Sequence, residues 1–185
     1  GSLTPIDPRT GKPGPAVPVD DPYNMYFTPD GRSAIVVAEA RKRLDFRDPK
    51  TMALQYSIEV PGCDGINHAD FSIDGRFAIF TCEFQGSLVK VDLVGRKVVG
   101  YLKLSKGRMP QDIRISPDGK RFYIADMHAD GVHIVDGESF TSATTYDQFS
   151  RPAVLTYPSS LAVTNVYDAQ GKLAEAEADC RDALE

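Results

Sequence analysis

A short pattern that occurs three times limits most strongly how this chain can fold. Each copy has two apolar runs separated by an Asp-Gly pair that is followed by a basic residue, and the copies occupy residues 27–36, 71–80 and 115–124. The Asp-Gly pairs begin at Asp30, Asp74 and Asp118, so the period is 44 residues at both steps. Asp48, Asp92 and Asp136 keep the same spacing. A constant period of this length is characteristic of repeat architectures.

Each repeat is expected to contain four short strands. In the middle repeat, β-branched and apolar runs bounded by turn residues predict strands at residues 66–73, 76–82, 87–93 and 97–104. Four antiparallel strands in about 40–45 residues correspond to one blade of a β-propeller. A long β-sandwich would not require a constant period. The sequence therefore predicts an all-β chain, a partial β-propeller of four-stranded antiparallel blades with a β-rich C-terminal extension.

Three regions follow from where the repeat holds and where it stops. Residues 1–140 are expected to form the partial propeller, and the match of residues 7–10 to 48–51 suggests that the chain begins inside a repeat. The next Asp-Gly pair should occur near residue 162 but is absent, so residues 141–174 are interpreted as a β extension. Residues 175–185 have a helical composition and are expected to be a helical or frayed tail.

Two resemblances add to this interpretation. The Pro-Asp-Gly-(Arg/Lys) turn, followed by an apolar strand and by Val-Lys-Val-Asp or His-Ile-Val-Asp, resembles the YVTN-type β-propellers over residues 3–140. That group is related to the haem d1-binding propellers of cytochrome cd1 type, and it implies an architecture of seven or eight blades rather than an activity. Tyr-Asp pairs at residues 146 and 167 make residues 146–173 resemble the YD repeats of RHS-type proteins, which build shells around toxin cargo. Ser150 and Lys172 depart from that pattern, which usually has Gly and Arg there.

Composition and charge exclude some classes of protein. A chain of 185 residues can bury a real core, and no apolar run approaches the length of a membrane span. The net charge of -5 argues against a general nucleic-acid binder. No signal peptide is visible, but residues 1–2 and 184–185 resemble cloning remnants, so the compartment stays open, including a secreted or periplasmic one with the leader removed.

The cysteines predict no disulfide framework. Their number is odd, and no Cys-x-x-Cys spacing occurs among Cys63, Cys82 and Cys180. Two buried thiols are the favoured interpretation for Cys63 and Cys82, with a disulfide between them as the alternative.

Candidate ligand-binding residues gather at one end of the expected blades. Because strands alternate in direction, the loop entering the first strand and the loop between the second and third strands lie at the same end. That end is expected to carry His68, Glu83, Asp112, His128, Arg41 and Arg108. His68 could be a metal or haem ligand, a general base, or a histidine hydrogen-bonded inside the channel mouth. The segment from Met127 to His133 could hold a metal or be a solvated loop, and the basic residues could bind an anion or simply be solvated.

No catalytic motif is recognisable: the sequence has no Gly-rich phosphate loop, serine triad or paired-carboxylate motif. The leading interpretation is a non-catalytic module that binds a protein or a small ligand at the loop face. The alternatives are a tetrapyrrole- or metal-binding redox propeller and a part of an RHS-type toxin shell. Because closure of a propeller takes at least about four blades, a homo-oligomer is expected. An ion pair between Asp70 and Arg114 is also expected, since these are equivalent positions of adjacent blades.

Overall fold

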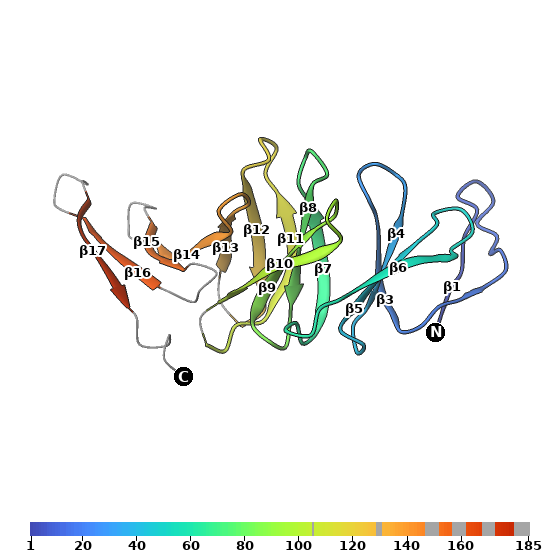
Figure 1. Cartoon of the computed structure of the whole chain (residues 1–185), viewed down its shortest axis with the longest axis horizontal. Helices are drawn as coiled ribbons and strands as arrows, with labels where there is room; N and C mark the ends of the chain where they lie inside the picture. Colours follow the sequence, from blue (N-terminus) through green and yellow to red (C-terminus); the bar gives the residue numbers. More distant parts are fainter. Residues whose placement is uncertain (105, 129–130, 147–151, 157–161, 168–172, 180–185) are drawn as a thin grey trace.

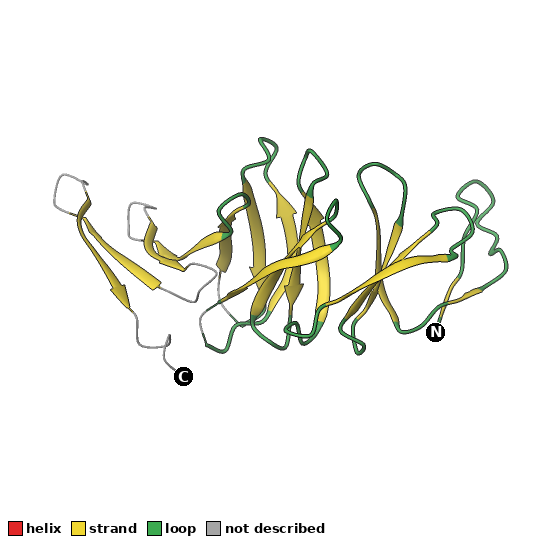
Figure 2. Ribbon diagram, in the orientation of Figure 1, coloured by secondary structure: helices red, strands yellow, loops and turns green. Residues whose placement is uncertain are grey.

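The computed structural model describes residues 1–104, 106–128, 131–146, 152–156, 162–167 and 173–179, and these fold into strands and connecting loops (Figures 1 and 2). Three antiparallel sheets stand side by side along the long axis of the molecule, and the chain runs from one end of this row to the other. A small additional pair, β1 (Ser2–Leu3) and β2 (Val17–Pro18), precedes them. The described residues contain no helix that is long and apolar enough to span a membrane.

The first two sheets are four-stranded blades in which consecutive strands are neighbours. The first contains β3 (Pro22–Phe27), β4 (Ala34–Ala38), β5 (Arg43–Arg47) and β6 (Leu54–Glu59). The second contains β7 (Ile66–Phe71), β8 (Phe77–Cys82), β9 (Ser87–Asp92) and β10 (Lys97–Lys103). The four strands expected in the middle repeat are therefore confirmed, with bounds that differ by one or two residues at most.

The third sheet is a blade that continues into the C-terminal extension. Its blade strands are β11 (Pro110–Ile115), β12 (Arg121–Asp126), β13 (Gly131–Asp136) and β14 (Thr141–Tyr146). The same sheet then adds β15 (Pro152–Thr156), β16 (Ala162–Tyr167) and β17 (Leu173–Asp179). The helix expected from residue 175 was wrong for 175–179, because Leu-Ala-Glu-Ala-Glu-Ala-Asp has the period of a strand and pairs with β16. The YD-like segments 147–151 and 168–172 and residues 180–185 lie outside the described residues.

The three Asp-Gly pairs form the same turn in each blade, as the repeat predicts. Gly31, Gly75 and Gly119 have φ values of 68, 70 and 76°, a region in which glycine has no steric penalty. Each glycine N–H donates to a carbonyl three residues earlier, at 2.8–2.9 Å. Asp48, Asp92 and Asp136 lie at the turn between the third and fourth strands of each blade. Their carboxylates accept backbone N–H groups there, as Asp48 does from Thr51 at 2.8 Å. The sequence repeat is therefore a structural repeat down to individual hydrogen bonds.

The core lies between the blades rather than within one of them. One cluster joins the first and second blades around Phe46 and Phe80, and another joins the second and third around Phe122. Burial of each such side chain stabilises the fold by about 1.5–3 kcal/mol. Because each cluster draws on two sheets, neighbouring blades stabilise one another.

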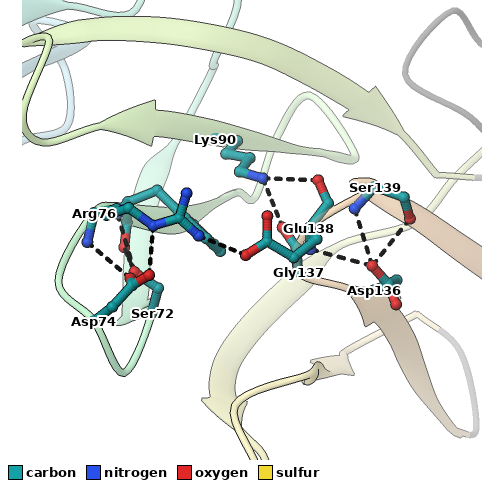
Figure 3. Close-up of polar contacts among 9 residues, drawn as sticks. Ser72, Asp74, Arg76, Lys90, Asp136, Gly137, Glu138 and Ser139 are labelled. Atoms are coloured by element: carbon teal, nitrogen blue, oxygen red, sulfur yellow. Dashed lines mark hydrogen bonds and ion pairs between the residues drawn. The ribbon is translucent and has the colours of Figure 1, made fainter.

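A buried cation also links the second and third blades (Figure 3). The Lys90 Nζ donates to the carbonyls of Gly137 and Glu138, at 2.6 and 3.1 Å, and lies 4.0 Å from the centroid of the Phe77 ring. Beside it, Arg76 donates to Glu138 at 2.7 Å and also contacts Asp74 of its own turn. We call Arg76, Lys90 and Glu138 the inter-blade clamp.

The ion pair expected between Asp70 and Arg114 does not form. The Asp70 carboxylate accepts the backbone N–H of Ile115 at 2.7 Å and that of Phe71 at 2.8 Å. Arg114 donates instead to the carbonyl of Ile113. The two blades are thus joined here by a carboxylate bound to backbone, because strand β11 approaches β7 closely enough to offer its amide directly.

The preference for buried thiols was wrong as well, because Cys63 and Cys82 form a disulfide. Ile66 pairs with Cys82, and the pairing of the two strands is irregular between Ile66 and Ala69. The loop before β7 therefore turns back alongside the end of β8, and the two Cα atoms come within 5.0 Å. Both cysteines are completely buried.

Candidate functional site

The first strands of the blades place three polar residues in a row at the loop end. Asn24 on β3, His68 on β7 and Asp112 on β11 are 44 residues apart and occupy equivalent positions. The Nδ1 atom of His68 lies 3.3 Å from the Asn24 amide nitrogen and 3.4 Å from an Asp112 carboxylate oxygen. The predicted grouping of His68 with Asp112 is therefore present in the structure.

His68 is held in place on the side of Nδ1. The Tyr26 hydroxyl lies 3.4 Å from Nδ1 and also accepts the backbone N–H of Ala69 at 3.2 Å. The backbone N–H of His68 donates to the Thr81 hydroxyl at 3.0 Å. The His68 side chain is 26% exposed and that of Asp112 is 67% exposed, so both can be reached from solvent.

A second polar row lies next to the first. The Asn67 amide nitrogen donates to Glu83 at 2.7 Å and lies 3.4 Å from the side-chain oxygen of Gln111. Asn67 is completely buried, and Glu83 is 8% exposed. Because Asn67 and Gln111 adjoin His68 and Asp112 in sequence, this row connects the His68–Asp112 pair to the loop that carries Glu83.

Three of the predicted residues line one pocket of about 310 Å³ between the second and third blades. Glu83 comes from the second blade, whereas Arg108 and His128 come from the third. The remaining lining residues are Phe84, Gly107 and Met109. A carboxylate, a guanidinium and an imidazole therefore converge beside an exposed aromatic ring.

Several polar atoms in and beside this site have no hydrogen-bond partner among the described residues. They are the side-chain oxygens Oδ1 of Asn67 and Oε1 of Glu39, which are acceptors, and the donor Nε of Arg108. Burial raises the pKa of Glu39 above its ordinary value, and the charges of Glu83 and Asp21 raise it further. Burying unpaired polar atoms costs free energy, so each of these atoms destabilises this end of the blades.

The disulfide holds one wall of the pocket. The loop that follows Cys63 accepts backbone hydrogen bonds from the pocket turn: Gly65 O from Glu83 at 2.8 Å, and Asp64 O from Phe84 at 3.0 Å. The turn then leaves no room for a side chain at Gly86, where an added Cβ would lie 2.8 Å from the carbonyl oxygen of Arg108. Glycine at this position therefore lets the two walls approach each other.

A carboxylate holds the other wall. Asp126 occupies the position equivalent to Cys82 and accepts the backbone N–H groups of Met109 at 3.1 Å and His128 at 2.8 Å. Its second oxygen lies 2.8 Å from His133 Nε2, and both side chains are buried. Burial alone would raise the Asp126 pKa, but the hydrogen bonds from His133, Met109 and His128 outweigh burial and lower it.

The histidines predicted as possible metal ligands therefore have separate environments. His128 lines the pocket, whereas His133 is buried and paired with Asp126 of the same blade. Across the described residues, no group of three or more His, Cys, Asp or Glu side chains is arranged to hold a metal ion.

Arg41 is not brought into this pocket. Its guanidinium lies 3.4 Å from Asp20, and its backbone N–H donates to Asp21 at 3.1 Å. Asn67, Tyr26 and Gln111 also belong to the polar rows of the site but were not predicted from the sequence. The signal that could have identified Asn67 and Gln111 was present, because these two polar residues are 44 positions apart on consecutive first strands.

Comparison with known proteins identifies the fold. No protein-family model matches the sequence, and no curated protein matches it significantly. Among solved structures, periplasmic gluconolactonase from Pseudomonas aeruginosa is similar with a TM-score of 0.61 and 16% identity, over 96% of this chain and 62% of that one. Hydrazine synthase from Kuenenia stuttgartiensis gives a TM-score of 0.59 and 18% identity, over 88% of this chain and 50% of that one. The β-propeller domain of Myceliophteria thermophila Cps50 (Swd1) gives a TM-score of 0.56 and 15% identity, over 87% of this chain and 56% of that one.

The fold is that of a β-propeller. At these identities the similarity establishes architecture and not activity. The chain spans about half to two thirds of the length of these three proteins. Its blades therefore correspond to part of such a propeller.

Proposed function

We propose that this chain is a non-catalytic binding module that holds a small polyhydroxylated acid, or its lactone, at the loop end of the second and third blades. The observation that carries the proposal is the pocket formed by Glu83, Arg108 and His128 beside the unpaired oxygen of Asn67. Hydroxyl groups of the ligand would donate to Glu83, which a hydrogen bond from Asn67 holds in place. A carboxylate or lactone carbonyl would accept from Arg108.

Two further observations support this choice of ligand and setting. One of the similar structures is a periplasmic gluconolactonase, and gluconolactone is a compound of this chemical class. The buried Cys63–Cys82 disulfide favours an oxidising compartment, such as the periplasm or the extracellular space. The two observations are independent of each other.

The experiment that tests the proposal is calorimetric titration of the protein with gluconate and with gluconolactone. We expect Arg108→Ala to weaken binding by about tenfold or more, because it removes a charged partner of the ligand. His68→Ala should weaken binding too, because His68 adjoins Asn67, which holds Glu83 in the pocket. Their thermal midpoints should remain close to that of the parent. Lys120→Ala, which removes an exposed lysine at the opposite end of the third blade, is the control and should bind normally.

Two results would contradict the proposal. Intact binding by His68→Ala, together with a large loss of stability, would assign this histidine to the fold instead of to the ligand. Release of acid from gluconolactone faster than in buffer, and lost in His68→Ala, would show that the module is catalytic.

A further inference from the structure

A second pocket of about 540 Å³ lies at the other end of the blades, between the first and second blades. It is formed where the Asp-Gly turn of the first blade meets the β9–β10 turn of the second. Its lining includes Asp30, Arg32, Gln55, Tyr56 and Arg96. The candidate site described above lies at the opposite end, so the two pockets share no residue.

The internal repeat shows what occupies the same place between the second and third blades. There the inter-blade clamp fills the space, with Glu138 bound to Arg76 at 2.7 Å (Figure 3). Forty-four residues earlier, Val94 stands in place of Glu138 and Arg32 in place of Arg76. The first groove therefore keeps the arginine of the clamp but lacks the carboxylate that reaches it from the next blade.

A second substitution adds another cation to the first groove. Arg96 stands where the third blade has Phe140, which is 3% exposed and part of the core. The Arg96 guanidinium carbon lies 4.2 Å from the centroid of the Tyr56 ring, and Arg96 forms no ion pair with the described residues. Tyr56 is itself stacked on Phe46, with the centroids 4.4 Å apart, so the aromatic support of Arg96 is fixed in place.

The charges in the groove are unbalanced in favour of cations. Arg32 has one nearby carboxylate, Asp30 of its own turn at 3.7 Å, and its side chain is 86% exposed. Gln55 is already engaged, because it accepts from Ser33 at 2.6 Å and donates to the Arg32 carbonyl at 3.1 Å. Two guanidinium groups thus face one carboxylate beside the aromatic ring of Tyr56.

We propose that this groove is a second binding site, which takes a carboxylate group carried on an apolar or planar body. The carboxylate would occupy the place that Glu138 holds in the clamp and would bind Arg32 and Arg96, whose forked guanidinium groups suit a two-oxygen partner. The body of the ligand would pack on the apolar side of the groove, at Leu93 and the exposed Val94. Such a group can come from a small organic acid or from an acidic side chain of a partner peptide.

The test uses three probes: benzoate, a capped tripeptide with a central glutamate between two valines, and inorganic phosphate. Each is titrated into the ¹⁵N-labelled protein while amide shifts around Arg32, Tyr56 and Arg96 are followed. We expect benzoate or the tripeptide to bind, and the tighter of the two identifies the source of the carboxylate. Arg96→Gln should weaken that binding by about tenfold or more. Binding of phosphate but of neither carboxylate would overturn the proposal.

Val94→Glu provides the sharper variant. It restores the carboxylate of the clamp to the first groove, so it should abolish binding of the probe while leaving the protein at least as stable to heat. Val99→Glu, which adds the same charge at an exposed valine outside the groove, is the matched control and should bind normally. Probe binding that survives both Val94→Glu and Arg96→Gln would overturn the assignment of the site. Loop-end binding of gluconate is measured separately, so either proposal can fail without the other.

Discussion

Loss of the Cys63–Cys82 disulfide is expected to lower the stability of the protein substantially. The bond joins residues 19 positions apart and so closes a loop of about twenty residues in the unfolded chain. The chain-entropy relation gives roughly 3 kcal/mol for a loop of this size at 25 °C. Because both cysteines are completely buried, replacing them with alanine should add a smaller cost from lost packing.

Urea unfolding followed by far-ultraviolet circular dichroism measures this effect. With an m value of about 1–3 kcal/mol per M, the midpoint should fall by about 1–3 M in the Cys63→Ala/Cys82→Ala double variant. Addition of a reductant should lower the midpoint of the parent to a similar value. Cys180→Ala, which keeps the pair intact, is the control, although Cys180 lies outside the described residues.

Two results would refute this reasoning. A midpoint that reductant leaves unchanged would show that the pair does not constrain the unfolded chain. A thiol titration of the unfolded, unreduced protein that finds three reactive thiols, instead of at most one, would show that the disulfide is absent.

The remaining predictions concern the clamp, the turns and the open face of the first blade. Lys90→Met should lower the free energy of unfolding by about 1–3 kcal/mol, because the carbonyls of Gly137 and Glu138 lose a charged donor. An unchanged urea midpoint would show that the clamp does not stabilise the fold. The side-chain and backbone N–H groups of Arg76 lower the pKa of Asp74 from 3.8 to about 2. The ionised Asp74 carboxylate therefore contributes fully to stability above pH 3.8, and this contribution is lost as the pH falls toward 2. Asp74→Asn should flatten the acid limb of a plot of melting temperature against pH. Met25 is exposed although its equivalents Ala69 and Ile113 are buried, and Phe27 is exposed although its equivalents Phe71 and Ile115 are half-buried. Light scattering should therefore find association that Phe27→Lys reduces.

The blade architecture could be predicted because it depends on local and periodic signals. The positive φ at Gly31, Gly75 and Gly119 is a property of the Asp-Gly turn itself, and alternation of side chains defined each strand. The same reasoning brought His68 to Asp112, because equivalent positions on consecutive first strands must be neighbours.

Contacts that depend on the details of strand register could not be predicted. The disulfide lies beside an irregularity in the pairing of β7 with β8, between Ile66 and Ala69, which no residue pattern predicted. Asp70 was assigned to the correct interface but to the wrong partner, because a backbone amide can compete with a guanidinium for a carboxylate. The pocket wall held by Asp126 was missed because Met109 and His128 of that wall donate backbone N–H groups to it, which any sequence offers.

An amide-resolved titration with gluconate is the most direct test of ligand binding at the loop end. Chemical-shift changes should concentrate at Glu83, Arg108 and His128, with smaller changes at His68 and Asp112. They should vanish in Arg108→Ala and persist in Lys120→Ala. Shift changes confined to the Asp-Gly turns, or no shift changes at millimolar gluconate, would contradict ligand binding at the loop end.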